Sequence, residues 1–208
     1  MLEVDEGSQR SLTAKGRATR QRIIEVASDL MVVRGVAAVS LDEVGLATST
    51  SKSQMYHYFA SKDDLVSCVV TYVRDQILAS HARMLVEVTS IDDVQRWAHA
   101  IIEFQRYSPQ LSGCPLGTLA SELVNESGSE HLGIRESFYS WESLLEDALR
   151  RLRDAGELRA DANPYRLAMA TLASLQGGLL MSKVLQSVTP LTVALDAAVS
   201  YLRTFSED

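Results

Sequence analysis

The sequence contains little that would build a chemical centre or a cross-linked fold. Its 208 residues include two cysteines, Cys68 and Cys114, which lie far apart and form no C-x-x-C pair. This excludes a disulfide framework and favours reduced thiols. The four histidines lack metal-ligand spacing, and the G-x-G-x-x-G, P-loop and G-x-S-x-G patterns are absent. We therefore expect no metal site, no cofactor and no enzymatic activity.

Prolines and long hydrophobic runs are also scarce. The chain has four prolines and 46% hydrophobic residues, which favours a globular and largely helical fold. The longest uncharged run, Leu167 to Ser182, is too short for a membrane span. Residues 1–9 carry three acids where a secretory signal would be basic. These features predict a cytoplasmic protein that does not enter a membrane.

The chain as a whole has no net positive charge, but one part of it does. The net charge is −7, of which residues 1–9 contribute −3, residues 10–63 contribute +3 and residues 64–208 contribute −7. A basic segment attached to an acidic body would restrict contact with a polyanion to one end of the molecule.

Residues 40–64 contain three helix starts in close succession. Ser40, Ser51 and Ser61 each stand where a hydroxyl can cap a helix, with an acid or amide three residues later. The spacing predicts helices over 41–47 and 52–58 and a third from 62, with residues 48–50 in the turn. Two short helices joined by such a turn match a helix-turn-helix, whose second helix enters the DNA major groove.

The second of these helices has two different faces. Met55 and Phe59 are four residues apart and are expected to pack into a small core. Their predicted partners are Leu41, Val44 and Leu46. The other face has hydrogen-bond donors and no carboxylate: Lys52, Ser53, Gln54, Tyr56 and His57. Because a surface helix normally mixes both charge signs, this face suits a polyanionic partner such as DNA.

These residues resemble a known family. S-L-D-E-V at 40–44, followed by S-x-S-x-M-Y-x-Y-F-x-S-K-x-x-L at 51–65, is similar to the N-terminal domain of the tetracycline-repressor (TetR) family of transcriptional regulators. The similarity is specific from about Thr19 to Leu65 and only architectural beyond. The chain departs from the family pattern in the turn, where Ser49 replaces the usual glycine, and at Tyr58, where a histidine is more usual.

The resemblance implies an all-α fold. An N-terminal three-helix helix-turn-helix DNA-binding domain would be followed by a C-terminal helical ligand-binding and dimerisation domain. We place a flexible acidic and polar tail at 1–14, the DNA-binding domain at 15–63 and the effector-binding and dimerisation domain at 64–208. The implied base-edge candidates are Lys52, Ser53, Gln54 and His57, and the implied phosphate candidates are Ser40, Tyr56, Tyr58 and Lys62.

Some of these assignments have alternatives. Gln54 can cap its own helix instead of reading a base. Arg17, Arg20 and Arg22 occupy the first turns of a helix expected from about residue 15 to Arg34, where cations oppose the helix dipole. Phosphate contact explains the placement of Arg17 and Arg20, although a solvated face explains each of them equally well.

Further helices are predicted along the rest of the chain. Their expected ranges are 62–88, 91–109, 111–126 and 134–156, then one opened by Asn163-Pro164 to about 187 and one opened by Thr189-Pro190 to about 205. The last two are apolar around most of their circumference, so a second chain is expected to cover them. The resemblance implies a homodimer through a four-helix bundle of these helices. The alternative is that both helices are internal core.

The resemblance also implies a pocket for a small-molecule effector. The candidate lining residues are Tyr72, Trp97, Ile101, Phe104, Tyr107, Cys114, Phe138, Trp141, Leu145 and Gln176. Aromatic residues at such spacing are often simple core, but their number favours an apolar or aromatic effector. Cys114, before Pro115, is either a reactive thiol or a buried small residue.

The predicted function is a ligand-responsive transcriptional regulator. By resemblance it would most often be a repressor that binds a palindromic operator in double-stranded DNA as a homodimer and is released by a small molecule. The alternative is a helical small-molecule binding or interaction protein with a degenerate DNA-binding head. Ser49 and the net charge are the support for this alternative.

Overall fold

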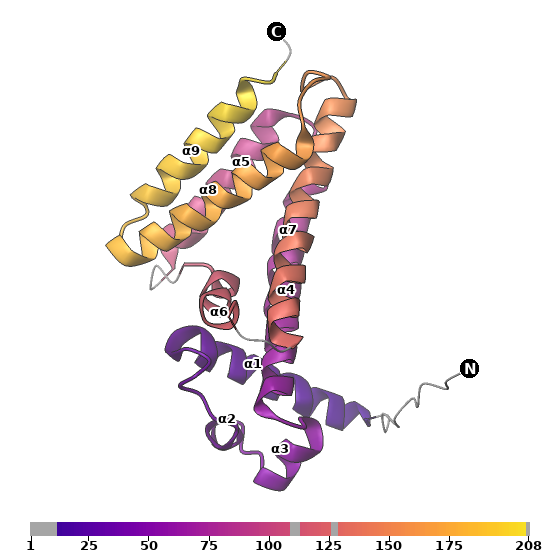
Figure 1. Cartoon of the computed structure of the whole chain (residues 1–208), viewed down its shortest axis with the longest axis vertical. Coiled ribbons are helices and arrows are strands. Elements are labelled where there is room, and N and C mark those ends of the chain that lie inside the picture. The colour runs from indigo at the N-terminus through magenta and orange to yellow at the C-terminus, as the bar shows by residue number, and fades with distance from the viewer. Residues whose placement is uncertain (1–11, 109–112, 126–128, 207–208) are drawn as a thin grey trace, which may run out of the picture.

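The computed structural model describes residues 12–108, 113–125 and 129–206, and the regular elements in these ranges are all α-helices. Three helices form a head at one end of the molecule, and two long helices, α4 and α7, run from the head into the body (Figure 1). α6 lies next to the head, in contact with α1, α4 and α7, whereas α5 packs on α4, α8 packs on α7, and α9 packs on α5 and α8 (Figure 1). The elements are α1 (Ala14–Arg34), α2 (Leu41–Ala47), α3 (Lys52–Tyr58), α4 (Lys62–Leu85), α5 (Ile91–Tyr107), α6 (Pro115–Leu123), α7 (Ser129–Asp154), α8 (Pro164–Leu185) and α9 (Thr189–Arg203).

The predicted helix starts of the head are confirmed, together with their chemical cause. Ser40 and Ser51 both form capping boxes, in which the serine hydroxyl accepts from the backbone N–H three residues on and that residue's side chain accepts in return. Ser61 caps α4 through its hydroxyl alone, since the Asp64 carboxylate accepts from the N–H of Ala60 instead. These bonds fix where α2, α3 and α4 begin.

The core of the head is nearly the predicted one. Val44, Met55 and Phe59 are buried, and Leu41 packs at the edge of the same cluster. The prediction for Leu46 was wrong, because its side chain is 82% exposed. Residues two apart on an α-helix point about 200° away from each other, so Leu46 cannot share the inward face of Val44.

The turn between α2 and α3 requires the backbone freedom that glycine usually provides. Ser49 adopts a left-handed backbone conformation, with φ of 52°, although it is not a glycine. Gly45 makes the turn tight, since a Cβ atom there would lie 3.0 Å from the Thr50 carbonyl oxygen. The turn is closed by the Thr50 N–H, which donates to the Gly45 carbonyl at 2.8 Å, and by the Thr48 hydroxyl, which donates to that of Thr50 at 3.0 Å.

The body follows the predicted order of helices with shifted ends. α4 ends at Leu85, where Arg151 of α7 donates to the Leu85 carbonyl at 2.6 Å, and not near residue 88. α6 begins at Pro115 and ends at Leu123, so it is shorter than the predicted 111–126, although residues 109–112 and 126 lie outside the described ranges. α9 begins at Thr189 itself, so the prediction that Thr189 caps this helix was wrong.

The last two helices form the most extensive helix pair of the fold. Gly178 of α8 allows the close crossing, because a Cβ atom there would lie 2.9 Å from the Cα of Leu191 on α9. By length and hydropathy the whole of α8, unlike its uncharged run alone, could cross a membrane. Within the fold, 44% of the apolar 18-residue window of α8 is already buried, and a single such helix is weak evidence for a membrane span.

Candidate functional sites

The acid-free face of α3 is exposed at the tip of the head. Lys52, Ser53, Gln54, Tyr56 and His57 are all exposed, whereas Met55 and Phe59 anchor the helix from behind. Figure 1 shows α3 at the end of the molecule that lies away from α8 and α9. The helix can therefore approach a flat or grooved partner without hindrance from the body.

The α3 side chains keep donors available for such a partner. Lys52 pairs with Asp42 at 3.3 Å, but both side chains are about two-thirds exposed, so this bond is weak and exchangeable. Gln54 caps α3 by accepting from the Ser51 N–H at 3.1 Å through Oε1. Its amide N–H groups are not used by the cap, so the two roles considered for Gln54 are compatible. Tyr58 is half-buried and packs on the core, with its ring edge against His57.

The predicted phosphate candidates around α3 differ in how far their polar groups are already engaged in hydrogen bonds. The Ser40 hydroxyl is occupied by the capping box of α2. Lys62 donates to the Ala37 carbonyl at 3.4 Å, and Arg17 is exposed beside the Leu12 carbonyl. Arg20 points inward, with its guanidinium 2.9 Å from the Cys68 sulfur and 5.1 Å from the centre of the Phe59 ring. Arg20 thus ties α1 to α3 and α4.

One basic residue outside the selected candidates positions the helix-turn-helix. Arg22 on α1 donates to the Thr48 carbonyl at 2.9 Å. This bond satisfies the carbonyl at the C-cap of α2 and ties the start of the turn to α1. The sequence offered no signal for it beyond the cluster of arginines, because the turn and Arg22 are 26 residues apart.

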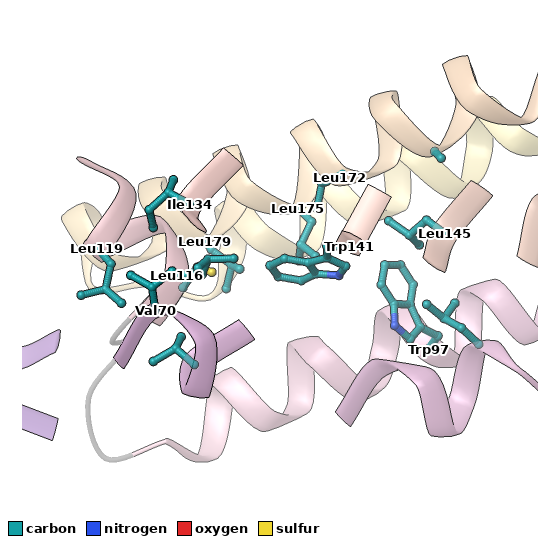
Figure 2. Packing of buried hydrophobic residues seen from close by; sticks show 14 of the residues in the cluster. Val70, Trp97, Leu116, Leu119, Ile134, Trp141, Leu145, Leu172, Leu175 and Leu179 are labelled. Atoms are coloured by element: carbon teal, nitrogen blue, oxygen red, sulfur yellow. The ribbon is translucent and has the colours of Figure 1, made fainter. Parts of the chain in front are cut away.

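A cavity of about 360 Å³ lies in the body, between α4, α5, α7 and α8 and the start of α6. Its walls are mainly apolar and aromatic, and Figure 2 shows Trp97, Trp141, Leu175 and Leu179, where the wall is part of the buried core. Met84 and Phe104, which are 38% and 72% exposed, are at its open side. The lining residues are Gln76, Ile77, Ser80, His81, Met84, Trp97, Ala100, Ile101, Phe104, Gln105, Gly113, Cys114, Pro115, Trp141, Leu175 and Leu179.

The structure brings five of the ten predicted pocket residues together around this cavity: Trp97, Ile101, Phe104, Cys114 and Trp141. Tyr72 lies elsewhere, beside Arg20 and Cys68, and Tyr107 is 80% exposed away from the cavity. Phe138 and Leu145 pack in the core. Gln176 is not in the wall but lies behind it, with its amide nitrogen 3.6 Å from the Cys114 sulfur.

His81 is one of four polar residues of the cavity that the sequence did not reveal, with Gln76, Ser80 and Gln105. Its Nδ1 accepts from the Trp97 indole N–H at 3.0 Å, and its ring lies 4.9 Å from that of Trp141. Burial lowers the pKa of His81 from its usual 6.5 to about 4, so the ring is neutral at pH 7. A single histidine on α4 had no partner in sequence, because Trp97 and Trp141 come from other helices.

The described residues of the cavity wall carry no formal charge. None of its lining residues is Asp, Glu, Lys or Arg, and burial raises the pKa of the Cys114 thiol, which therefore stays protonated. Cys114 is 8% exposed and accepts from the Gly117 N–H at the start of α6. Among the described residues no group of His, Cys, Asp and Glu side chains could hold a metal ion.

Comparisons with known proteins identify the family of both parts of the chain. Residues 23–69 match the model of bacterial regulatory proteins of the tetR family, and residues 90–198 match that of the tetracyclin repressor-like C-terminal domain. The chain is 25% identical to the uncharacterized HTH-type transcriptional regulator YxaF of Bacillus subtilis (strain 168), over 86% of this chain and 92% of that one. It is 24% identical to the HTH-type transcriptional repressor DhaR of Mycobacterium sp. (strain GP1), over 83% and 86%.

Solved structures share the fold. A TetR-family regulator from Cytophaga hutchinsonii superposes with a TM-score of 0.82 at 18% identity, covering 95% of this chain and all of that one. A TetR regulator from Chloroflexus aurantiacus gives 0.81 at 22% identity, covering 93% and 98%. The two family models between them account for the head and for more than half of the chain. The chain therefore belongs to the TetR family of transcriptional regulators, which are not enzymes, and joins a DNA-binding helix-turn-helix to a ligand-binding C-terminal domain.

Proposed function

We propose that this protein is a homodimeric repressor that binds a palindromic operator through α3 and is released when a small molecule fills the body cavity. The observation that carries the proposal is the course of α4. This helix begins in the head at Lys62, and its later turns supply Gln76, Ile77, Ser80, His81 and Met84 to the cavity wall. One rigid element thus touches both the DNA-binding unit and the ligand space.

The proposed DNA contacts follow from exposure and chemistry. Lys52, Ser53, the Gln54 amide and His57 face the bases, while Tyr56, Lys62 and Arg17 face the phosphates. Ser40 and Tyr58 act by holding α2 and α3, and Arg20 by holding α1 against α4. Two heads in a dimer would place their α3 helices in successive major grooves, about 34 Å apart.

The dimer is supported by apolar side chains left uncovered on α8 and α9. On α8 the exposed residues recur on one face: Met169, Leu180, Met181, Val184 and Leu185. Val193 and Tyr201 are exposed on α9. An apolar face of this kind, on two adjacent helices, is the usual sign of a protein interface. A second copy, forming a four-helix bundle, would bury it.

The structure supports a second connection between cavity and head, through α6. Cys114 and Pro115, at the start of α6, line the cavity. Glu122, near its other end, accepts from the Ala37 N–H at 3.2 Å and approaches Gly35, in the loop between α1 and α2. Lys62 of α4 donates to the carbonyl of the same Ala37. A ligand that displaces α4 relative to α6 would change the support of the head on both sides of Ala37.

Selection of random duplex DNA on the purified protein, followed by sequencing, tests the proposal. We expect a palindrome with two equal half-sites, bound by a dimer with a steep salt dependence. Lys62→Ala and Tyr56→Ala are expected to weaken this binding. If a folded dimer stripped of small molecules selects no sequence, the alternative of a binding protein with a degenerate head is correct.

A further inference from the structure

An ion pair joins the starts of the two helices of the helix-turn-helix. Lys52 is the first residue of α3 and Asp42 the second residue of α2, and the Lys52 Nζ lies 3.3 Å from the Asp42 Oδ2. The two side chains are 68% and 65% exposed, so each keeps room for a further partner. Asp42 thus brings a carboxylate to the exposed face of a helix that has none of its own.

The two carboxylates of α2 differ in what holds them. Glu43 is used within the head, because it accepts from the Ser40 N–H and from Arg34. Asp42 instead has Lys52, a proposed base-reading residue, as its partner. A carboxylate close to DNA phosphates weakens binding by repulsion, so an acid beside α3 needs an attractive contact that offsets it. The dipole of α2 also favours an acid at Asp42, and the experiment has to separate this stabilising role from a contact with DNA.

The major-groove edge of a G·C base pair has the matching arrangement of groups. Guanine presents two acceptors, N7 and O6, and cytosine presents its N4 amino group, one hydrogen of which remains free in the groove. O6 and N4 are joined by a base-pairing hydrogen bond, so they lie about 2.9 Å apart. The ion pair has a donor and an acceptor at nearly the same separation, 3.3 Å. Lys52 can therefore donate to guanine while Asp42 accepts from cytosine, and their own bond is retained.

We propose that Lys52 and Asp42 together read one G·C base pair in each half-site of the operator, with Lys52 on guanine and Asp42 on the N4–H of cytosine. This inference rests on the proposed function, since it requires α3 to lie in the major groove. It adds Asp42 to the residues that contact DNA and names a base pair that the operator contains. The bond to Asp42 also holds the flexible lysine side chain at the base edges and away from the phosphates.

The same geometry ranks the four base pairs that can occupy this position. A T·A pair still offers an acceptor, O4, to Lys52 and an amino group, N6, to Asp42, but a methyl group replaces the N7 acceptor. The reversed pairs, C·G and A·T, place an amino group against the ammonium group of Lys52 and a carbonyl oxygen against the carboxylate of Asp42. We therefore expect G·C to be preferred, T·A to follow and the two reversed pairs to bind least well, because like groups meet only in the reversed pairs.

Selection from one random duplex library by the native protein and by three variants tests this reading. Lys52→Ala and Asp42→Ala should each lose the preference for G·C at the same position of the half-site and keep the preferences at the other positions. Asp63→Ala is the matched control, because it removes an exposed acid from the first turn of α4 in the same head and should change no position. On four duplexes that differ at this base pair alone, the native protein should favour G·C over either reversed pair by about 10-fold or more, and Lys52→Ala and Asp42→Ala by less than about 3-fold.

A base analogue locates the contact of Asp42. N4-methylcytosine opposite guanine keeps the base-pairing hydrogen of N4 and replaces the hydrogen in the groove by a methyl group. The native protein should bind this duplex about 10-fold less tightly than the unmodified one, whereas Asp42→Ala should bind the two within about 2-fold. Equal binding of both duplexes by the native protein would overturn the assignment. A lower melting temperature of Asp42→Ala with unchanged base preference would also overturn it, because that result is the one expected from the dipole of α2 alone.

The outcomes also separate this inference from the proposed function. If the native protein selects a palindrome but Asp42→Ala keeps the same preference at every position, the protein is the proposed regulator and Asp42 reads no base. If Asp42→Ala binds every duplex more tightly by the same factor, Asp42 only repels the phosphates, which likewise refutes the reading. If the native protein selects no sequence, the proposed function fails and the assignment of Lys52 and Asp42 falls with it.

Discussion

Replacing His81 should change how the stability of the protein depends on pH. Burial holds the pKa of His81 at about 4 in the folded protein, compared with 6.5 in an unfolded chain. Between these values the unfolded state binds more protons than the folded state, so stability is complete above about pH 6.5 and falls as the pH drops toward 4. From pH 7 to pH 5 the loss from this one group amounts to about 2 kcal/mol.

The size of the effect makes it measurable by thermal unfolding. For a chain of this length about 1 kcal/mol shifts the melting temperature by roughly 2–4 °C, so His81 should contribute a fall of about 4–8 °C between pH 7 and pH 5. The assay compares the native protein with His81→Asn, whose amide oxygen can still accept from the Trp97 indole. Asparagine does not titrate, so the variant should lack this part of the pH dependence.

Other groups also titrate, which is why the difference between the two proteins is the quantity to measure. Burial, with the nearby Glu146, raises the pKa of Glu142 and makes the folded state less stable as the pH rises above 4.5. The backbone N–H of Ser40, with Arg34, lowers the pKa of Glu43, with the opposite sign. Both contributions cancel in the comparison. Parallel melting curves of the two proteins over pH 5–7 would refute the assignment of a buried, neutral His81.

Four further predictions concern the interface, the DNA face, the coupling and the turn. Val184→Glu on α8 should shift the dimer, twice 22.9 kDa, toward monomer in light scattering, whereas Val86→Glu, at a similarly exposed valine at the end of α4, should not; a dimer in both would exclude the α8 face. Lys52→Ala should lower the slope of log affinity against log salt for the selected duplex by about 1, while Arg106→Ala on the body leaves it unchanged; equal slopes would remove Lys52 from the interface. Glu122→Ala should keep the separate affinities for DNA and for ligand within about 3-fold, yet reduce the ligand-induced loss of DNA affinity by about 5-fold or more. Glu122→Gln, which still accepts from the Ala37 N–H, should retain the full ligand-induced loss. Full coupling in Glu122→Ala would exclude the α6 connection. Gly45→Ala should destabilise the protein by about 1–2 kcal/mol because its Cβ would lie 3.0 Å from a backbone oxygen, while Gly133→Ala meets an ordinary contact at 3.5 Å and should not; chemical denaturation distinguishes the two.

The head was predictable from sequence because its signals are local. Ser40 with Glu43, and Ser51 with Gln54, are three residues apart, so the capping bonds that begin α2 and α3 can be read directly from the chain. The failures in the same region are also local. Leu46 was assigned to the core by hydrophobicity alone, although its position two residues after Val44 turns it outward.

The cavity was only partly predictable because an empty space depends on how the helices pack in three dimensions. Hydrophobic periodicity identifies Trp97, Trp141 and Leu145 as inward residues equally well. Only the packing of five helices determines that the first two border empty space and that Leu145 does not. His81 shows the same limit, because its partners are 16 and 60 residues away along the chain.

The helices that a ligand contacts determine how strongly it can act on DNA binding. A ligand shifts a conformational equilibrium only by the difference between its affinities for the two states. Apolar contact with the wall changes little when α4 slides by a fraction of a turn, whereas a hydrogen bond to His81 is directional and is lost with a small displacement. A ligand bonded to His81 on α4 and packed on the Trp141 ring on α7 would therefore favour one relative position of these two helices. Because α4 begins at Lys62, which donates to the Ala37 carbonyl in the head, the hydrogen bond to His81, more than the larger aromatic surface, should set the coupling between ligand and operator.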